Sequence, residues 1–158
     1  NGRTPMQWDS SPAAGFSEAV PWIDVPASAE HINVAAQADD PQSILAYYRA
    51  LISARHVVPA LTDGTFTRID ASAPALFVYR RSAPGSDVLV MVNLSGEYTT
   101  PLFSPEDEAV ASLPWRLYLG NTDTSFVETD DAGDRVQSEP TVITPMRPWE
   151  ARVYLLAN

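Results

Sequence analysis

Acidic side chains that stand next to one another are the first residues in this sequence that could do chemistry. Such groups occur at Asp39-Asp40, Glu106-Asp107-Glu108 and Asp130-Asp131. Glycoside hydrolysis uses two carboxyl groups, one of which has its pKa raised by burial. The acidic groups here have polar neighbours in expected loops or helix starts, and none follows an apolar strand. We interpret them as capping or solvated residues and expect no catalytic residue in this chain.

The other residue types that carry chemistry are scarce. The two histidines, His31 and His56, do not show metal-ligand spacing, and cysteine is absent. The sequence has no Gly-x-Ser-x-Gly elbow, no phosphate loop and no dinucleotide fingerprint. We therefore expect no metal site and no cofactor.

One candidate binding residue, Arg3, stands near the start of the chain. It belongs to the run Asn1-Gly2-Arg3-Thr4-Pro5-Met6-Gln7-Trp8-Asp9. A guanidinium fork can hold two oxygen atoms at once, and a proline-stiffened turn beside Trp8 would keep it in place. Considered as a single residue, an ordinary exposed surface arginine is the alternative interpretation.

The elements that would position these residues change in type along the chain. The first forty residues contain four prolines and no helical periodicity, yet they carry Met6, Trp8, Phe16 and Trp22, which need a surface to bury against. Apolar residues at three- and four-residue steps then predict a helix over residues 41–58. We expect Asp40 to cap this helix, Pro41 to lie in its first turn and Pro59 to end it.

The remainder of the sequence predicts β structure. The expected strands are residues 65–69, 75–80, 88–94, 116–119 and 151–156. Residues 88–92 are apolar throughout and predict a central strand covered on both faces. Residues 104–107 predict a capped helical turn, and residues 130–134 predict an exposed loop. Short strands separated by turns are typical of an antiparallel sandwich, with Trp115 and Trp149 in its core.

Composition excludes several classes of partner. The 158 residues carry a formal net charge of −10, which disfavours nucleic acid and anionic membrane surfaces. A hydrophobic content of 45% argues against disorder, and no apolar run approaches a membrane span. All ten basic residues are arginine, which together with abundant alanine suggests a GC-rich bacterial gene. With no signal peptide visible, we expect a cytoplasmic protein.

Motifs spread along nearly the whole chain form one series. In chain order they are Arg3-Thr4-Pro5-Met6-Gln7-Trp8-Asp9, Ala14-Gly15-Phe16-Ser17, Pro21-Trp22-Ile23, Ile32-Asn33-Val34, Gln37, Asp40-Pro41, Ser43, residues 47–52, Arg55 and Arg147-Pro148-Trp149-Glu150-Ala151. This series closely resembles the α-glucosidases of the α-amylase superfamily, glycoside hydrolase family thirteen, which include the oligo-1,6-glucosidases.

The resemblance implies a mixed fold in two parts. In that family the catalytic domain is a (β/α)₈ barrel, and its three catalytic carboxylates precede the Arg-Thr-Pro motif. Residues 1–59 would then be the loop after the last barrel strand and the final barrel helix. Residues 60–158 would be domain C, an antiparallel β-sandwich that shields the barrel. The missing N-terminal catalytic barrel would be the partner of this chain.

The resemblance also implies a function. The parent would be a retaining, exo-acting α-glucosidase of short α-glucoside oligosaccharides, and this chain alone would be inactive. Arg3 would contact the non-reducing glucose in the −1 subsite and pair with an upstream aspartate, while Gln7 and Trp8 brace the loop. Two alternatives stay open: part of a trehalose synthase or sucrose isomerase, or a non-catalytic carbohydrate-binding sandwich that presents Trp115 or Trp149.

Overall fold

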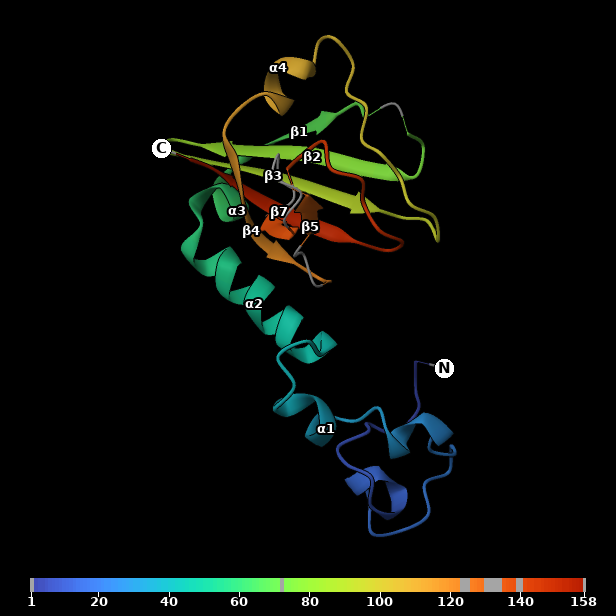
Figure 1. Cartoon of the computed structure of the whole chain (residues 1–158). Helices are drawn as coiled ribbons and strands as arrows, with labels where there is room; N and C mark the ends of the chain where they lie inside the picture. Colours follow the sequence, from blue (N-terminus) through green and yellow to red (C-terminus); the bar gives the residue numbers. More distant parts are fainter. Residues whose placement is uncertain (1, 72, 123–125, 130–134, 139–140, 158) are drawn as a thin grey trace. The chain divides into compact units, whose positions relative to one another are not determined.

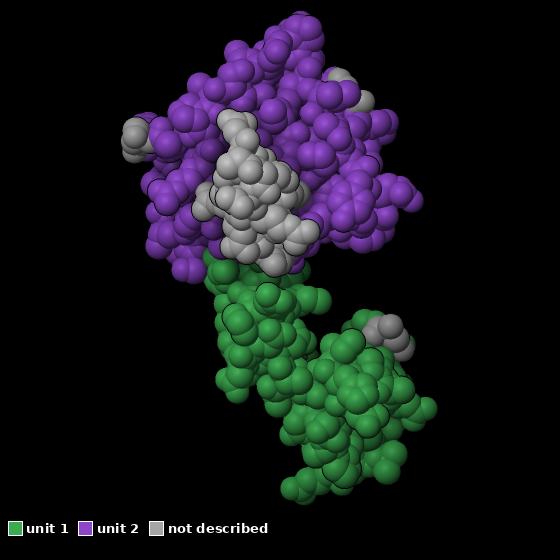
Figure 2. All heavy atoms as spheres, in the orientation of Figure 1, with its two compact units in different colours: residues 1–50 green, residues 51–158 purple. Residues whose placement is uncertain are grey.

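The chain folds into two compact units, residues 1–50 and residues 51–158 (Figure 2). The computed structural model describes residues 2–71, 73–122, 126–129, 135–138 and 141–157. The exposed loop expected at residues 130–134 lies outside these described residues.

Short helices and loops make up the first unit. Its helices before residue 40 are η1 (Pro12–Gly15), η2 (Ala27–Glu30) and α1 (Val34–Ala38). Prolines stand at or next to the starts of η1 and η2, and none of the three helices exceeds five residues. The prediction that prolines interrupt regular structure in this region is confirmed.

The expected long helix is α2 (Ile44–Val57), but its cap is not the predicted residue. The hydroxyl Oγ of Ser43 accepts a hydrogen bond from the N–H of Ala46 at 3.1 Å, as an N-cap does. Asp40 instead closes the preceding turn, where its Oδ1 accepts the N–H of Gln42 at 2.9 Å. The Asp40 cap was therefore wrong, because the aspartate side chain bonds to its own turn. Pro59 ends α2 as predicted and also begins α3 (Pro59–Asp63).

A five-stranded antiparallel sheet dominates the second unit (Figure 1). Its order is β1 (Thr65–Ile69), β2 (Leu76–Ala83), β3 (Ser86–Asn93), β7 (Ala151–Leu156) and β4 (Trp115–Gly120). The five predicted strands are confirmed, with bounds that shift by at most three residues. A separate hairpin of β5 (Phe126–Thr129) and β6 (Arg135–Ser138) was not predicted. The predicted turn at residues 104–107 leads into α4 (Glu108–Ala111), and Ser104 Oγ accepts the N–H of Asp107.

Both faces of the sheet are covered, so β3 is the buried central strand that its apolar run predicts. Leu89 and Met91 point to one core, and Val88 and Val90 point to the other. The buried members of the first core are Ile69, Ala71, Leu76, Val78, Leu89, Met91, Val142, Met146 and Tyr154. The buried members of the second are Val58, Ala60, Val88, Val90 and Val153. Each large apolar side chain buried in this way contributes about 1.5–3 kcal/mol.

A fully buried ion pair anchors the segment that precedes β7. Arg152 Nη2 lies 2.8 Å from Glu150 Oε2, and both side chains are inaccessible to solvent. The same guanidinium donates to the carbonyl oxygens of Thr144 and Pro145, each at 2.8 Å. The Glu150 carboxylate also accepts the N–H of Arg147 at 2.7 Å. The pair thus joins β7 to the loop at residues 144–147.

The two tryptophans expected in the core behave differently. Trp115 packs against the first core, and its indole N–H donates to the carbonyl of Val110 at 2.7 Å. Trp149 is 63% exposed, so its assignment to the core was wrong. Its backbone has φ +57°, the left-handed region, in a turn that the N–H of Glu150 closes on the carbonyl of Arg147 at 3.2 Å before β7 begins.

Candidate functional site

Arg3 lines a pocket of about 370 Å³ in the first unit. Its lining residues are Arg3, Thr4, Pro5, Phe16, Ser17, Val20, Pro21, Trp22 and Ile23. The guanidinium carbon of Arg3 lies 5.8 Å from the centroid of the Trp22 ring, within cation–π range. Both side chains are accessible to solvent, and the Trp22 side chain is 85% exposed. The pocket therefore offers an outward-facing cation beside an aromatic face.

Backbone hydrogen bonds hold the loop that carries Arg3. The carbonyl oxygens of Gln7 and Trp8 accept the N–H groups of Val34 and Ala35, both at 2.9 Å, at the start of α1. These bonds satisfy amides that a helix start leaves without partners. The side chain of Gln7 also donates to Ser28 Oγ at 3.4 Å. The loop that follows Arg3 is thus attached to both α1 and η2.

A tight turn follows the Arg3 loop and depends on Gly15. The carbonyl of Ala14 accepts the N–H of Trp8 at 2.9 Å, which folds residues 8–14 into a closed loop. Gly15 has φ +65°, and a Cβ at this position would lie 2.7 Å from Asp9 Oδ2. Hydrogen bonds from the Ser11 side chain and backbone lower the pKa of Asp9, which keeps this carboxylate charged. Glycine is therefore favoured here by the positive φ, and a Cβ would displace the Asp9 carboxylate.

The residues that the sequence set aside as non-catalytic have ordinary structural surroundings. Asp107 Oδ2 accepts the N–H of Asp70 at 3.0 Å, next to the turn that begins α4. His31 and His56 are both exposed. Asp130-Asp131 lies outside the described residues. Across the residues that the structure describes, no three His, Cys, Asp or Glu side chains form a group that could hold a metal ion.

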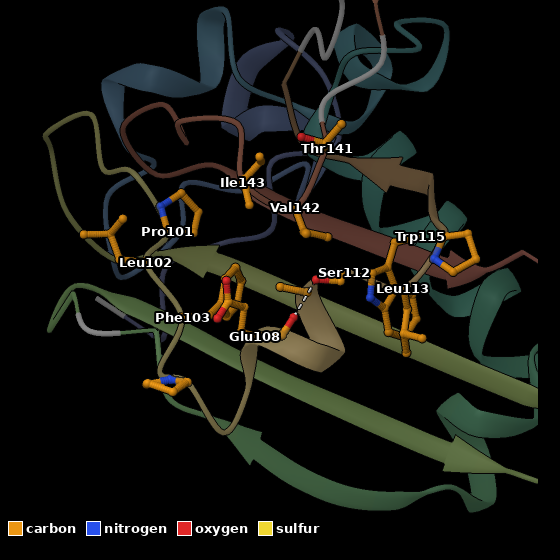
Figure 3. Close-up of a pocket in the computed structure, with 13 residues that line it drawn as sticks. Pro101, Leu102, Phe103, Glu108, Ser112, Leu113, Trp115, Thr141, Val142 and Ile143 are labelled. Atoms are coloured by element: carbon orange, nitrogen blue, oxygen red, sulfur yellow. Dashed lines mark hydrogen bonds between the residues drawn. The ribbon is translucent and has the colours of Figure 1, made fainter.

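A larger hollow of about 700 Å³ lies in the second unit, between α4, the start of β4 and residues 141–143 (Figure 3). Its walls are mainly proline, leucine and aromatic side chains, among them Phe103 and Trp115. Glu108 is the one carboxylate among its described lining residues. Glycoside chemistry uses two carboxyl groups, and the described lining of this hollow supplies one.

Sequence reasoning selected Arg3, expected Trp22 to bury against another surface, and did not assign a role to Gly15. Trp22 and Gly15 belong to motifs of the series, Pro21-Trp22-Ile23 and Ala14-Gly15-Phe16-Ser17. Trp22 lies 19 positions after Arg3 in the sequence, and no periodicity spans that interval. Their contact follows from the loop conformation, which the sequence pattern does not encode.

Comparison with known proteins agrees with the motif series. Residues 1–64 match the family model "Alpha amylase, catalytic domain". The chain is 38% identical over 156 residues to the oligo-1,6-glucosidase of Heyndrickxia coagulans, covering 99% of this chain and 24% of the relative. It is 35% identical over 158 residues to the oligo-1,6-glucosidase of Halalkalibacterium halodurans, covering all of this chain and 26% of that protein.

Solved structures show the same relationship. The isomaltulose synthase of Protaminobacter rubrum is 31% identical with a TM-score of 0.79, over 100% of this chain and 26% of its own. These comparisons confirm the resemblance to the α-amylase superfamily that the motifs predicted, over residues 1–64 for the family model and over 99% of the chain for an oligo-1,6-glucosidase. Among curated relatives the chain is similar to oligo-1,6-glucosidases, and it spans about a quarter of their length.

No helix in the described part of the chain is both long and apolar enough to cross a membrane.

Proposed function

We propose that this chain is the C-terminal part of a retaining, exo-acting α-glucosidase that hydrolyses short α-glucoside oligosaccharides. The observation that carries the proposal is Arg3, held outward in a pocket by a loop attached to α1 and η2. Similarity to oligo-1,6-glucosidases over 99% of the chain supports the same substrate class. Arg3 would bind the glucosyl unit in the −1 subsite, where its fork can meet a sugar hydroxyl and a carboxylate together.

The catalytic carboxylates would come from the N-terminal part of the parent. In a retaining mechanism a carboxylate attacks the anomeric carbon while a second carboxyl group protonates the leaving oxygen. The second group then takes a proton from water, which attacks the glycosyl-enzyme and releases glucose. This chain would bind and orient the sugar but would perform neither step. It should therefore show no hydrolytic activity alone.

The proposed domain assignment follows the same division of labour. Residues 1–59 would complete a (β/α)₈ barrel, and residues 60–158 would form domain C, a β-sandwich. Support comes from α2, where Ile44, Tyr48 and Ile52 are 56–70% exposed at four-residue steps. Such a stripe lies on one side of a helix and is typical of a buried surface. The N-terminal catalytic barrel is the partner that would cover it.

An isomerase is the second candidate function. The chain aligns with the trehalulose synthase MutB at a TM-score of 0.75 and with isomaltulose synthases at 0.78 and 0.79. Such enzymes would keep the sugar in the pocket and exclude water. The residues that would separate the two outcomes are expected in the N-terminal part of the parent.

Product analysis of the parent enzyme separates these functions. We expect isomaltose to be cleaved to two glucose molecules, with α-glucose as the first anomer seen by NMR. Sucrose should give only free glucose and fructose. Isomaltulose or trehalulose as the main product from sucrose would favour the isomerase. Absence of turnover on all α-glucosides would refute both.

A further inference from the structure

Trp22 is an aromatic partner of the Arg3 guanidinium within the first unit. The guanidinium carbon of Arg3 lies 5.8 Å from the centroid of the Trp22 ring, and both residues line the same pocket. The face of an indole ring carries partial negative charge and attracts a cation more strongly than the ring of tyrosine or phenylalanine does. The attraction therefore acts on the charged end of the Arg3 side chain.

Packing in a hydrophobic core does not account for Trp22. Its side chain is exposed, and the two buried clusters of the described chain both lie in the second unit without it. The contact with Arg3 lies inside the first unit, so it does not depend on what covers the outer side of the ring. The contact is thus the observation from which a role for Trp22 can be argued.

The backbone is restricted on both sides of the contact. Pro5, which is buried, stands two residues after Arg3, and Pro21 directly precedes Trp22. A proline fixes its own φ and limits the conformation of the residue before it. The loop that follows Arg3 is also attached to α1 and η2 by the hydrogen bonds described above. Both segments that carry the contact therefore have little backbone freedom, and the side chains decide where the guanidinium lies.

A ring restrains a guanidinium in a different way from a carboxylate. A carboxylate accepts hydrogen bonds from the N–H groups of the fork, which are the groups that would bind a sugar hydroxyl. A ring attracts the charge as a whole. An arginine also has several rotatable bonds, and immobilising them when a ligand binds lowers the affinity. A ring contact made before the sugar arrives removes part of this cost.

We propose that Trp22 is a positioning residue for Arg3. Its ring holds the guanidinium in the pocket, so that the fork meets the glucosyl unit already oriented. Trp22 acts through Arg3 and need not touch the sugar itself. This inference rests on the proposed function, because Arg3 must bind the sugar for Trp22 to have an effect on turnover.

A double-mutant cycle in the parent enzyme, measured by steady-state kinetics on an aryl α-glucoside, tests this role. Trp22→Leu should lower kcat/KM about three- to tenfold, the size of a cation–π contact. In the Arg3→Ala background the same change should have an effect of less than about twofold, because the cation is gone. Trp22→Phe keeps an aromatic face and should recover most of the loss.

Replacement of Trp22 by tetrafluorotryptophan separates the charge of the ring face from its shape. Fluorine withdraws negative charge from the face while the ring keeps its flat, apolar form. This variant should lose activity as Trp22→Leu does, with an unchanged melting temperature, and it serves as the test if Trp22→Leu does not fold. Tyr98→Leu is the matched control, because it removes an exposed aromatic ring from the second unit, and its kcat/KM should stay unchanged.

Three results would overturn the proposal. They are wild-type kcat/KM for the fluorinated variant, an equal effect of Trp22→Leu with and without Arg3, and equal losses for Trp22→Phe and Trp22→Leu. In each case Arg3→Ala would still lower kcat/KM, and the proposed function would stand. Failure of the proposed function would appear instead as near-normal kcat/KM for Arg3→Ala itself.

Discussion

Removal of Arg152 should unfold the second unit more readily than any surface substitution. The Arg152→Ala variant leaves the fully buried Glu150 carboxylate without its cation, and breaking a buried pair in this way typically costs about 3–5 kcal/mol. The carbonyls of Thr144 and Pro145 also lose their donor, at about 1 kcal/mol each. Glu150 keeps the N–H of Arg147, which offsets part of the loss. We therefore expect a total of about 4–6 kcal/mol.

Urea denaturation at pH 7, followed by tryptophan fluorescence, measures this loss. With a slope of about 2 kcal/mol/M, the midpoint should fall by about 2–3 M. Arg116→Ala is the control, because Arg116 is an exposed arginine on the adjacent strand β4, and its effect should stay within about 0.5 kcal/mol. The double variant Glu150→Leu/Arg152→Met removes both charges, so it should cost about 2 kcal/mol less than the two single changes added together. A loss under 1 kcal/mol for Arg152→Ala would refute the reasoning.

Two further predictions concern the same unit. Gly64→Ala places a Cβ 2.3 Å from the carbonyl oxygen of Ala60, whereas a Cβ at Gly85 would meet no atom within 4 Å and bears only the strain of φ +70°. Gly64→Ala should therefore lower the melting temperature by more than Gly85→Ala. Equal effects on the melting temperature would contradict this prediction. Burial raises the pKa of Tyr154 to about 12 from the ordinary 10.0. As the pH rises, the unfolded chain therefore loses the phenol proton before the folded chain does. The free energy of unfolding should fall by about 2–3 kcal/mol between pH 10 and pH 12. Urea titrations across this range should show a smaller fall for Tyr154→Phe, and an equal fall would exclude Tyr154 as the source.

The sheet could be predicted because its strands are short apolar runs separated by turn residues. β3 is the clearest case, since Val88 to Met91 are apolar in succession and all four are buried. The helix α2 was predicted for a similar reason, but Asp40 and Ser43 are both good caps. Only the turn at residues 40–43 decides between them. Local periodicity thus located the elements, and side-chain bonding set their ends.

Features that depend on tertiary contacts could not be predicted from the hydrophobic pattern of the sequence. Glu150 and Arg152 alternate with Ala151 and Val153, which by itself indicates a solvent-facing side of a strand. They are instead buried, because each neutralises the other and the loop at residues 144–147 supplies further partners. The sign of φ at Trp149 and the contact between Arg3 and Trp22 likewise depend on tertiary structure. Arg3 itself was selected from its motif, and its role as a sugar-binding residue remains a proposal.

Steady-state kinetics of Arg3 variants in the parent enzyme test the central claim most directly. Arg3→Ala should reduce kcat/KM on an aryl α-glucoside by about ten- to a hundredfold, the cost of a lost charged hydrogen bond. Arg3→Lys should recover only part of this loss, because an ammonium group cannot reproduce the guanidinium fork. Melting temperature should change little, since Arg3 lies on a loop and belongs neither to α2 nor to the sheet core. Near-normal kcat/KM for Arg3→Ala, or a loss of activity that only follows a fall in melting temperature, would contradict the account.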